Sequence, residues 1–323
     1  MSARRSVLYV FTVLLGVLAM STEGLAAAKY PSRPIEMIVA FPAGGGQDVT
    51  FRILAKHAEK HIGGRIIVLN KVGGGGVIGN TEIARSKPDG YTLGTVGNNQ
   101  VTDEFTVKGV PYGYKDFVPV VQVAFDPHVL VIKNALKLDF KQFLEHAKKN
   151  PGKVSMGMGG TWTSHDFFRL KLEKAIGARF LSVAYQGGAP ALQAVSGGHI
   201  DSAVPFVVEA VPSLEGKLVT PLAVSSAERV PALKDVPSVK EFGVDAIQGQ
   251  MRGVSVPPGT PKEIIDLLDE AFAKTFKEPE FQSDMRKAGI SPFFRGHADY
   301  VKFYNDEHDR YAGLAKEFGI EAK

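Results

Sequence analysis

Short apolar runs alternate along the chain with segments of helical periodicity. Apolar, β-branched runs occupy Ile35–Phe41, Ile66–Asn70 and Tyr91–Val96. Between the first two runs, apolar residues recur on one helical face, and Gly63 and Gly64 follow them. That face is formed by Phe51, Leu54, Ala55, Ala58 and Ile62. Strands separated by such helices are typical of parallel sheets with right-handed crossovers, so we expect an α/β fold with mostly parallel sheets.

The same pattern starts again near the middle of the chain. A strand at Val154–Met158 is followed by a polar turn and another helix, and the long extended segment 116–132 separates the two modules. A second extended segment, 249–261, precedes helical sequence at Lys262–Phe276 and Ala298–Phe318. We therefore expect two α/β lobes joined by crossover strands. The first lobe would comprise residues 29–124 and 252–323, and the second lobe residues 125–251.

The N-terminal segment has the features of a secretory signal. Arg4 and Arg5 precede an apolar stretch from Val7 to Met20, and the small residues Ala26 and Ala28 suit a cleavage site. The stretch is short for a membrane span, although a retained anchor helix is the alternative. We interpret residues 1–28 as a signal peptide that directs the protein to the periplasm.

The composition narrows the possible classes of partner. The chain has 38 Lys and Arg against 34 Asp and Glu, a formal net charge of +4, and it contains no cysteine. The basic residues are interspersed with acidic ones and form no stripe with aromatic residues, which argues against a nucleic-acid partner. Without cysteine, an exported chain has neither disulfides nor a lipid-anchoring thiol, so its stability must come from its core.

A glycine-rich turn follows the first predicted strand. Gly44, Gly45 and Gly46 lie between that strand and a helix, where free backbone N–H groups and the helix dipole favour an anion. We expect a carboxylate cradle here, with Asp48 as the N-cap. A turn that is merely tight is the alternative.

A second glycine run, "VGGGGVIGN", matches the spacing of a dinucleotide fingerprint at Gly74, Gly76 and Gly79. The match is weak because four consecutive glycines produce it easily, and the chain reads "VGNN" where a ribose-binding acid belongs. No Walker lysine follows any of the glycine runs. We therefore expect no nucleotide cofactor.

The third turn, Gly159–Asp166, occupies the same place in the second module. Its hydroxyl groups and the helix that follows can donate to a carboxylate, and Ser164 is the expected N-cap. The sequence Ser164, His165, Asp166 suggests a hydrolase, but neighbours on a helix point in different directions and cannot form a relay. Trp162 is either a lid over a ligand or packing beneath the turn.

The histidines do not predict a metal site. His57 and His61 share one helix face, but Glu59 stands one position late for a zinc-protease pattern and no third ligand is evident. We interpret this face as solvated and expect no metal.

With these turns in place, the chain resembles the substrate-binding proteins of tripartite tricarboxylate transporters, also called the Bug family. Six blocks carry the resemblance, in order and near the family's spacing, over nearly the whole mature chain. They are "YPSRPIEMIVAFPAGGGQD", "GGGGVIGNTEIARSKPDGYTLGT", "PGKVSMGMGGTWTSHDFF", "AYQGGAPALQAVSGGHIDSAV", "PLAVSSAERVPALKDVPSVKEFG" and "VPPGTPKEIIDLLDEAF".

The resemblance implies a type 2 periplasmic binding protein whose two lobes close on a small carboxylate and deliver it to a membrane permease. It implies a ligand held by backbone N–H groups of two facing turns, with further residues at the cleft edge. The expected ligand-binding residues are Phe41, Pro42, Ala43, Gly44, Gly45, Gly46, Gln47, Asp48, Asn98, Asn99, Gly159, Gly160, Thr161, Trp162, Thr163, Ser164, His165, Tyr185, Gly187, Gly188 and Pro205.

The chain departs from the family's usual pattern at two places near the expected cleft rim. Met251 and Arg252 replace an aromatic pair, and Pro205 stands where an acidic or polar residue is common. Arg252 would meet a second ligand carboxylate or, as we favour, be a solvated hinge residue. The main alternatives for function are a ligand sensor for a membrane kinase on the same fold and a secreted enzyme that uses Ser164 and His165. We expect a monomer that is not an enzyme.

Overall fold

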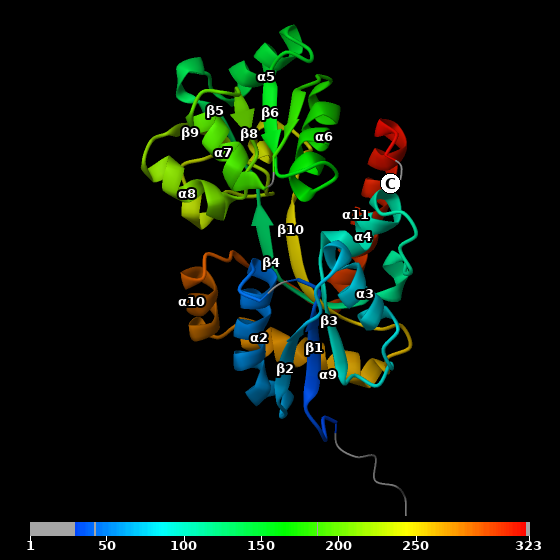
Figure 1. Cartoon of the computed structure of the whole chain (residues 1–323). Coiled ribbons are helices and arrows are strands. Elements are labelled where there is room, and N and C mark those ends of the chain that lie inside the picture. Colours follow the sequence, from blue (N-terminus) through cyan, green and yellow to red (C-terminus); the bar gives the residue numbers. More distant parts are fainter. Residues whose placement is uncertain (1–29, 42, 186, 321–323) are drawn as a thin grey trace, which may run out of the picture.

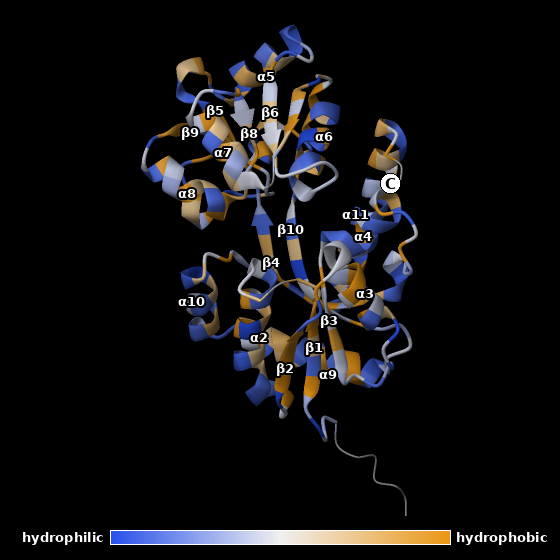
Figure 2. Cartoon of the chain, in the orientation of Figure 1, coloured by the Kyte–Doolittle hydropathy of each residue, from blue (hydrophilic) through white to orange (hydrophobic). Residues whose placement is uncertain are grey.

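The computed structural model describes residues 30–41, 43–185 and 187–320, which form two α/β lobes connected by two long strands (Figure 1). The expected signal peptide, residues 1–28, lies outside the described residues, as does Pro42. Figure 2 shows apolar residues concentrated in the sheets and on the helix faces that cover them. Each lobe therefore has its own core.

The first lobe contains a six-stranded sheet in the order β11-β4-β10-β3-β1-β2. The strands are β1 (Ile35–Val39), β2 (Ile66–Asn70), β3 (Thr92–Val96), β4 (Val118–Pro127), β10 (Gly249–Val256) and β11 (Pro292–Arg295). β1 pairs in parallel with β2 and β3, whereas β10 and β11 pair antiparallel. The sheet is mixed rather than mostly parallel, because the two strands that connect the lobes run in opposite directions through it.

Helices cover this sheet and complete the first core. They are α2 (Gly46–Ile62), α3 (Val77–Ala84), α4 (Asn98–Thr106), α9 (Lys262–Phe276), α10 (Pro279–Lys287) and α11 (His297–Phe318). The face of α2 expected from the apolar pattern is buried against the sheet and α9. α2 ends at Gly63, whose left-handed φ of 76° stops the helix without the steric penalty of a side chain.

The second lobe contains a five-stranded sheet in the order β7-β6-β8-β5-β9. Its strands are β5 (Val129–Lys133), β6 (Ser155–Met158), β7 (Leu181–Ala184), β8 (Ser202–Ala203) and β9 (Val219–Val224), and its helices are α5 (Phe140–Lys149), α6 (Ser164–Ile176), α7 (Gly188–Ser196) and α8 (Val207–Glu215). β6 is parallel to β7 and β8, and β5 is antiparallel to β8 and β9.

The chain passes between the lobes twice. β4 belongs to the first sheet as far as Pro127, and β5 of the second sheet starts at Val129, so His128 marks the first passage. The return passage leads from Gln248 into β10. The extended segments anticipated from the sequence are therefore these connecting strands.

Helix α11 contacts both lobes. Its Tyr311 packs edge-on against Phe167 of α6, with ring centroids 4.4 Å apart, and its Glu307 pairs with the buried Lys171 of α6 at 3.3 Å. The sequence analysis assigned residues 252–323 to the first lobe, and the structure adds that α11 also packs against α6 of the second lobe.

The expectation of a solvated face at His57 and His61 was wrong. Helix α10, which the sequence analysis missed, packs there, and His57 is buried within 3.3 Å of Glu278 and 3.0 Å of Asp284. His61 lies 2.5 Å from Glu278. These side chains join α2 to α10.

Candidate ligand-binding site

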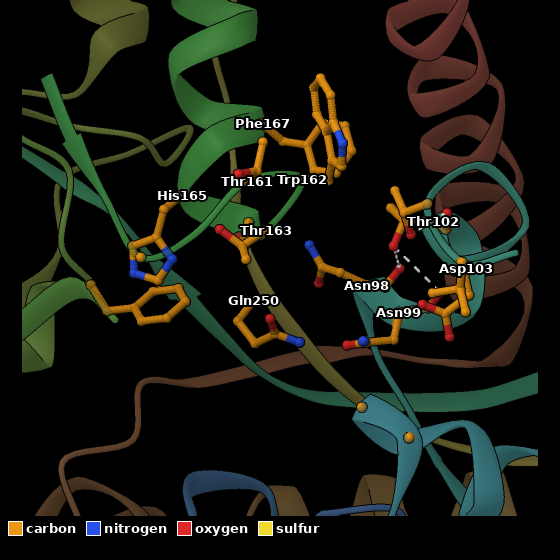
Figure 3. A pocket seen from close by; sticks show the side chains of 17 residues that line it. Asn98, Asn99, Thr102, Asp103, Thr161, Trp162, Thr163, His165, Phe167 and Gln250 are labelled. Carbon is orange, nitrogen blue, oxygen red and sulfur yellow. Dashed lines mark hydrogen bonds between the residues drawn. The ribbon is translucent and has the colours of Figure 1, made fainter. Parts of the chain in front are cut away.

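A cavity of about 410 Å³ lies where the first turn of α6 faces α4 across the two lobes (Figure 3). Asn98, Asn99, Thr102 and Asp103 lie on one side, and the turn around Trp162 lies on the other. The side chain of Gln250, from the connecting strand β10, lies between these two walls. The volume is in the range of small-molecule sites.

The structure brings part of the expected site together. The cavity is lined by Asn98, Asn99, Gly159, Thr161, Trp162, Thr163, Ser164 and His165. The other described candidates are not among its lining residues, namely Phe41, Ala43, Gly44, Gly45, Gly46, Gln47, Asp48, Gly160, Tyr185, Gly187, Gly188 and Pro205. The turn before α2 therefore does not border this cavity in the present arrangement of the lobes.

Other lining residues were missed by the sequence analysis. They are Gly74, Gly75, Thr102, Asp103, Thr106, Val107, Phe167, Phe206 and Gln250. The glycine run was a signal in the sequence for an unusual backbone. Gly73 to Gly76 all have positive φ angles, which other residues rarely adopt. What resembles a dinucleotide fingerprint is instead part of the cavity wall. The α4 and β10 residues had no local signal.

The start of α6 presents free donors to the cavity. The N-cap is Thr163, and its hydroxyl donates to the carbonyl of Gly160 at 2.9 Å rather than capping the helix. The expectation of Ser164 as the N-cap was wrong, because the helix begins at Ser164 itself. N–H groups in the first turn of a helix have no intrahelical acceptor, so those of Ser164 and His165 can bind an anion.

Asp166 fixes the shape of the turn before α6. Its carboxylate accepts the backbone N–H of Trp162 at 2.9 Å and pairs with Arg169 of the same helix at 2.6 Å. Trp162 adopts a φ of 59°, which is rare for a bulky residue and indicates strain. The buried Asp166 thus holds the Trp162 side chain in the cavity wall.

The start of α2 repeats this arrangement in the first lobe. Asp48 accepts the N–H of Gly44 at 2.9 Å and pairs with Arg52 at 2.9 Å. The expectation of Asp48 as the N-cap was wrong, because α2 begins at Gly46 and Gly45 is its N-cap. Burial alone would raise the pKa of Asp48, but the hydrogen bonds from Arg52, Gly44 and Asn70 outweigh it and lower the pKa. The N–H of Gly44 is therefore occupied, and only later donors of the turn remain for a ligand.

Arg252 is not the solvated hinge residue that we expected. Its side chain is only 12% exposed, and its Nη2 lies 2.6 Å from Asp126 of β4. The guanidinium lies above Gly46, where a Cβ would be 2.8 Å from Nη2. The pair therefore joins the two connecting strands directly beside the first turn of α2.

A buried network connects the cavity walls. His128 Nε2 lies 2.9 Å from the Ser164 hydroxyl, which also accepts from Gln248 at 3.0 Å. Gln248 bonds to Tyr311 at 2.8 Å, and the Asn98 side chain donates to Tyr311 at 3.0 Å. These bonds connect the start of α6 to the start of α4.

This network places Ser164 with His128 rather than His165. Complete burial lowers the pKa of His128 well below its ordinary value, and nearby His165 lowers it further. A histidine held neutral this firmly is a poor general base. The relay suggested by Ser164, His165 and Asp166 is not assembled, since Asp166 pairs with Arg169.

His165 is buried between aromatic rings, with the Phe206 centroid at 4.5 Å and the His128 centroid at 4.7 Å. Its Nε2 has no hydrogen-bond partner among the described residues and lies 3.7 Å from Glu209. Gly188 lies between His165 and Glu209. A Cβ at this position would be 2.8 Å from His165 Nε2 and would clash with the Glu209 carboxylate. The expected cleft-edge residue Gly188 thus contacts His165 rather than the cavity.

The described residues lack a metal site and a membrane-spanning helix. No group of three or more His, Cys, Asp or Glu side chains in the described ranges is placed to hold a metal ion. Within the same ranges, no helix combines the length and apolar character needed to cross a membrane.

Comparisons with known sequences and structures agree with this architecture. Residues 50–320 match the model of the tripartite tricarboxylate transporter family receptor, TctC. The chain is 32% identical to a UPF0065 protein of the tcbD-tcbE intergenic region in Pseudomonas sp. strain P51, over 96% of this chain and 95% of that protein. It is 29% identical to BugT of Bordetella pertussis, over 97% and 99% of the two chains.

Solved structures give the same result. A ligand-free TctC solute-binding protein from Polaromonas superimposes with a TM-score of 0.83 at 30% identity, over 89% of this chain and 99% of that one. Two proteins of Rhodopseudomonas palustris are similar at 25% identity, Rpa4515 with adipate and MatC with malate. Their TM-scores are 0.71 and 0.67, over 91% and 88% of this chain and 100% and 99% of theirs. The chain belongs to the TctC family of solute-binding receptors, which includes the Bug proteins.

Proposed function

We propose that this protein captures a small carboxylate-containing metabolite in the periplasm and delivers it to a tripartite tricarboxylate-type membrane transporter. The observation that carries the proposal is the opening of the first turn of α6 into the cavity between the lobes. Two structural neighbours hold the carboxylates adipate and malate. The apolar N-terminal segment supports export.

Backbone donors suffice for useful affinity. Each hydrogen bond to a charged group contributes about 1.5–3 kcal/mol. About four of them, less the free energy of ordering the ligand, reach the −8 kcal/mol or so of a micromolar complex. Among the described lining residues there is no Lys or Arg, so recognition would rest on N–H and hydroxyl donors.

Closure of the lobes would complete the site. Ala43–Gly46, before and at the start of α2, is exposed and does not border the cavity. A ligand held at α6 would favour a closed form in which the start of α2 also contacts it, since ligands shift equilibria toward the state they bind best. The closed form would then present the surface that the permease recognises.

Trp162 provides a direct test, because it is the only tryptophan in the chain and lines the cavity. We expect its fluorescence to change saturably with at least one member of a panel of mono-, di- and tricarboxylates. Small-angle scattering of the same samples should show compaction and a monomer. Native mass spectrometry of fresh protein should identify any retained ligand. If no acid of the panel causes either a fluorescence change or compaction, the proposal is wrong.

A secreted enzyme is the less favoured hypothesis, because the histidine that contacts Ser164 is the buried His128, whose pKa lies well below its ordinary value. In a binding protein, replacing His165 by Ala should only weaken ligand binding, whereas in an enzyme it should abolish turnover. Hydrolysis of an ester panel that disappears in this variant would support the enzyme instead.

A further inference from the structure

Asp103 is an unusual residue for the wall of an anion site. It lies on α4, is only 4% exposed, and borders the cavity opposite the turn at Trp162 (Figure 3). Among the described lining residues it is the one carboxylate, and no lysine or arginine accompanies it. No Lys, Arg or His in the described ranges forms a salt bridge with it. A buried acid without a counter-ion is costly and calls for a functional explanation.

Neutral donors hold the carboxylate in place. Tyr112 donates to Asp103 Oδ2 at 2.6 Å, and Asn80 donates to the Tyr112 oxygen at 3.1 Å. Gln100 in turn donates to Asn80 at 2.8 Å. This chain of buried groups orients Asp103 without neutralising it.

The carboxylate keeps acceptor capacity for a ligand. Two carboxylate oxygens offer about four acceptor positions, and Tyr112 and the Asn99 side chain account for two of them. A ligand carboxylate beside Asp103 would meet a like charge in a poorly solvated wall. A hydroxyl or an ammonium group would instead donate to it. The start of α6 therefore suits an anionic group of the ligand, and Asp103 on the opposite wall suits a hydrogen-bond donor.

We propose that Asp103 selects acids that carry a hydroxyl or ammonium group, with the acid group at the start of α6 and the donor at Asp103. This inference rests on the proposed carboxylate-binding function and specifies its ligand class. The ligands are hydroxy acids or amino acids rather than simple acids of the same length. Asp103 is in this view a specificity-determining residue.

A purely structural role is the alternative, in which Asp103 only anchors Tyr112. The variant Asp103→Asn distinguishes the structural role from the selective role. Its amide oxygen still accepts a hydrogen bond from Tyr112, but the negative charge is lost. A structural role predicts equal loss of affinity for every acid. Selection predicts a changed ratio between acids.

The test uses matched triplets of acids on the full mature protein. Each triplet keeps one carbon skeleton and varies one group: propionate, lactate and alanine; succinate, malate and aspartate; glutarate, 2-hydroxyglutarate and glutamate. Affinities are measured from Trp162 fluorescence and by calorimetry. We compare wild type with Asp103→Asn, with Tyr112→Phe, and with Glu104→Gln as a matched control. Glu104 is the next residue of α4, pairs with His308, and does not line the cavity.

We expect wild type to prefer the hydroxy or amino acid of at least one triplet by about tenfold or more, as one hydrogen bond to a charged group implies. Asp103→Asn should reduce that preference to about threefold or less, while Glu104→Gln keeps it. An unchanged preference in Asp103→Asn, or tighter binding of the simple acid by wild type, would overturn the inference and leave the proposed function intact. Absence of binding by every acid to wild type would overturn both.

Discussion

The Asp166 carboxylate accepts the backbone N–H of Trp162 at 2.9 Å and thereby closes the turn that precedes α6. Asp48 and Gly44 form the same bond at the same distance before α2. In both lobes an acid in the first turn of the helix fixes the loop behind it and pairs with an arginine, Arg169 or Arg52. Each turn is therefore held by contacts from its own helix in the absence of a ligand.

Replacing Asp166 by Ala should release the strained turn at Trp162. We expect a loss of about 2–4 kcal/mol in the free energy of unfolding, because Arg169 and the Trp162 N–H lose a buried partner. Acid affinity should fall about tenfold as the turn relaxes. Urea denaturation and Trp162 fluorescence titration measure the two effects.

Asp166→Asn keeps the shape of the side chain but loses its charge. Its stability and acid affinity should lie between those of wild type and Asp166→Ala. The matched control is Asp306→Ala, which removes an exposed acid paired with Lys302 and should change stability by less than about 0.5 kcal/mol. Wild-type affinity in a folded Asp166→Ala protein would show that the bond does not shape the site.

The Arg252–Asp126 pair should behave as a buried ion pair. Arg252→Met leaves Asp126, whose side chain is 7% exposed, without a charge partner, and we expect a cost of about 3 kcal/mol. Adding Asp126→Asn should recover at least about 1 kcal/mol of that loss. Denaturant unfolding of the single and double variants gives the coupling energy. Additive losses would mean that the two residues contribute independently.

The loss of stability on breaking the contact between α6 and α11 should depend on whether Lys171 or Glu307 is replaced. Lys171→Met should cost only about 1 kcal/mol, because methionine fills the buried space and Arg310, 3.5 Å from Glu307, still pairs with the carboxylate that is left. Glu307→Ala should cost about 3 kcal/mol, since Lys171 is left buried and charged. Burial lowers the pKa of Lys171, and Glu307 opposes that shift. The exposed pair Lys174–Glu317 serves as the control, and equal losses for Lys171→Met and Glu307→Ala would contradict this account.

Asp103 should make stability depend on pH. Burial raises the pKa of Asp103 from 3.8 to about 6, while hydrogen bonds from Tyr112 and Asn99 partly oppose the shift. Between these values the folded protein binds more protons than the unfolded chain, so stability falls as pH rises through this window. The stability of Asp103→Asn relative to wild type should therefore increase by up to about 3 kcal/mol between about pH 4 and about pH 7.

Urea denaturation of both proteins at several pH values measures this difference. Burial raises the pKa values of Tyr112 and Tyr304 above the ordinary value, so neither neighbour titrates in the window. The Glu104–His308 pair is present in both proteins, so its contribution to stability cancels when the two are compared. A difference that stays constant with pH would mean that Asp103 keeps its ordinary pKa in the folded state.

The sequence by itself determined the local elements and their repetition. The apolar face of α2, its end at Gly63 and the turns before α2 and α6 follow from side-chain periodicity and glycine positions, which depend on neighbours a few residues away. The connecting strands were also visible, because long apolar runs are extended and buried. Whether all of the candidate turns meet one ligand stays a prediction.

Only the tertiary structure decided which side chains face one another. Arg252 meets Asp126 because β10 and β4 pair antiparallel in one register, and Asp103 reaches the cavity because α4 stands opposite α6. Ser164 bonds to His128 and Gln248, which are distant in the sequence. Such contacts depend on strand register and on helix packing between lobes, which residue patterns within one element do not specify.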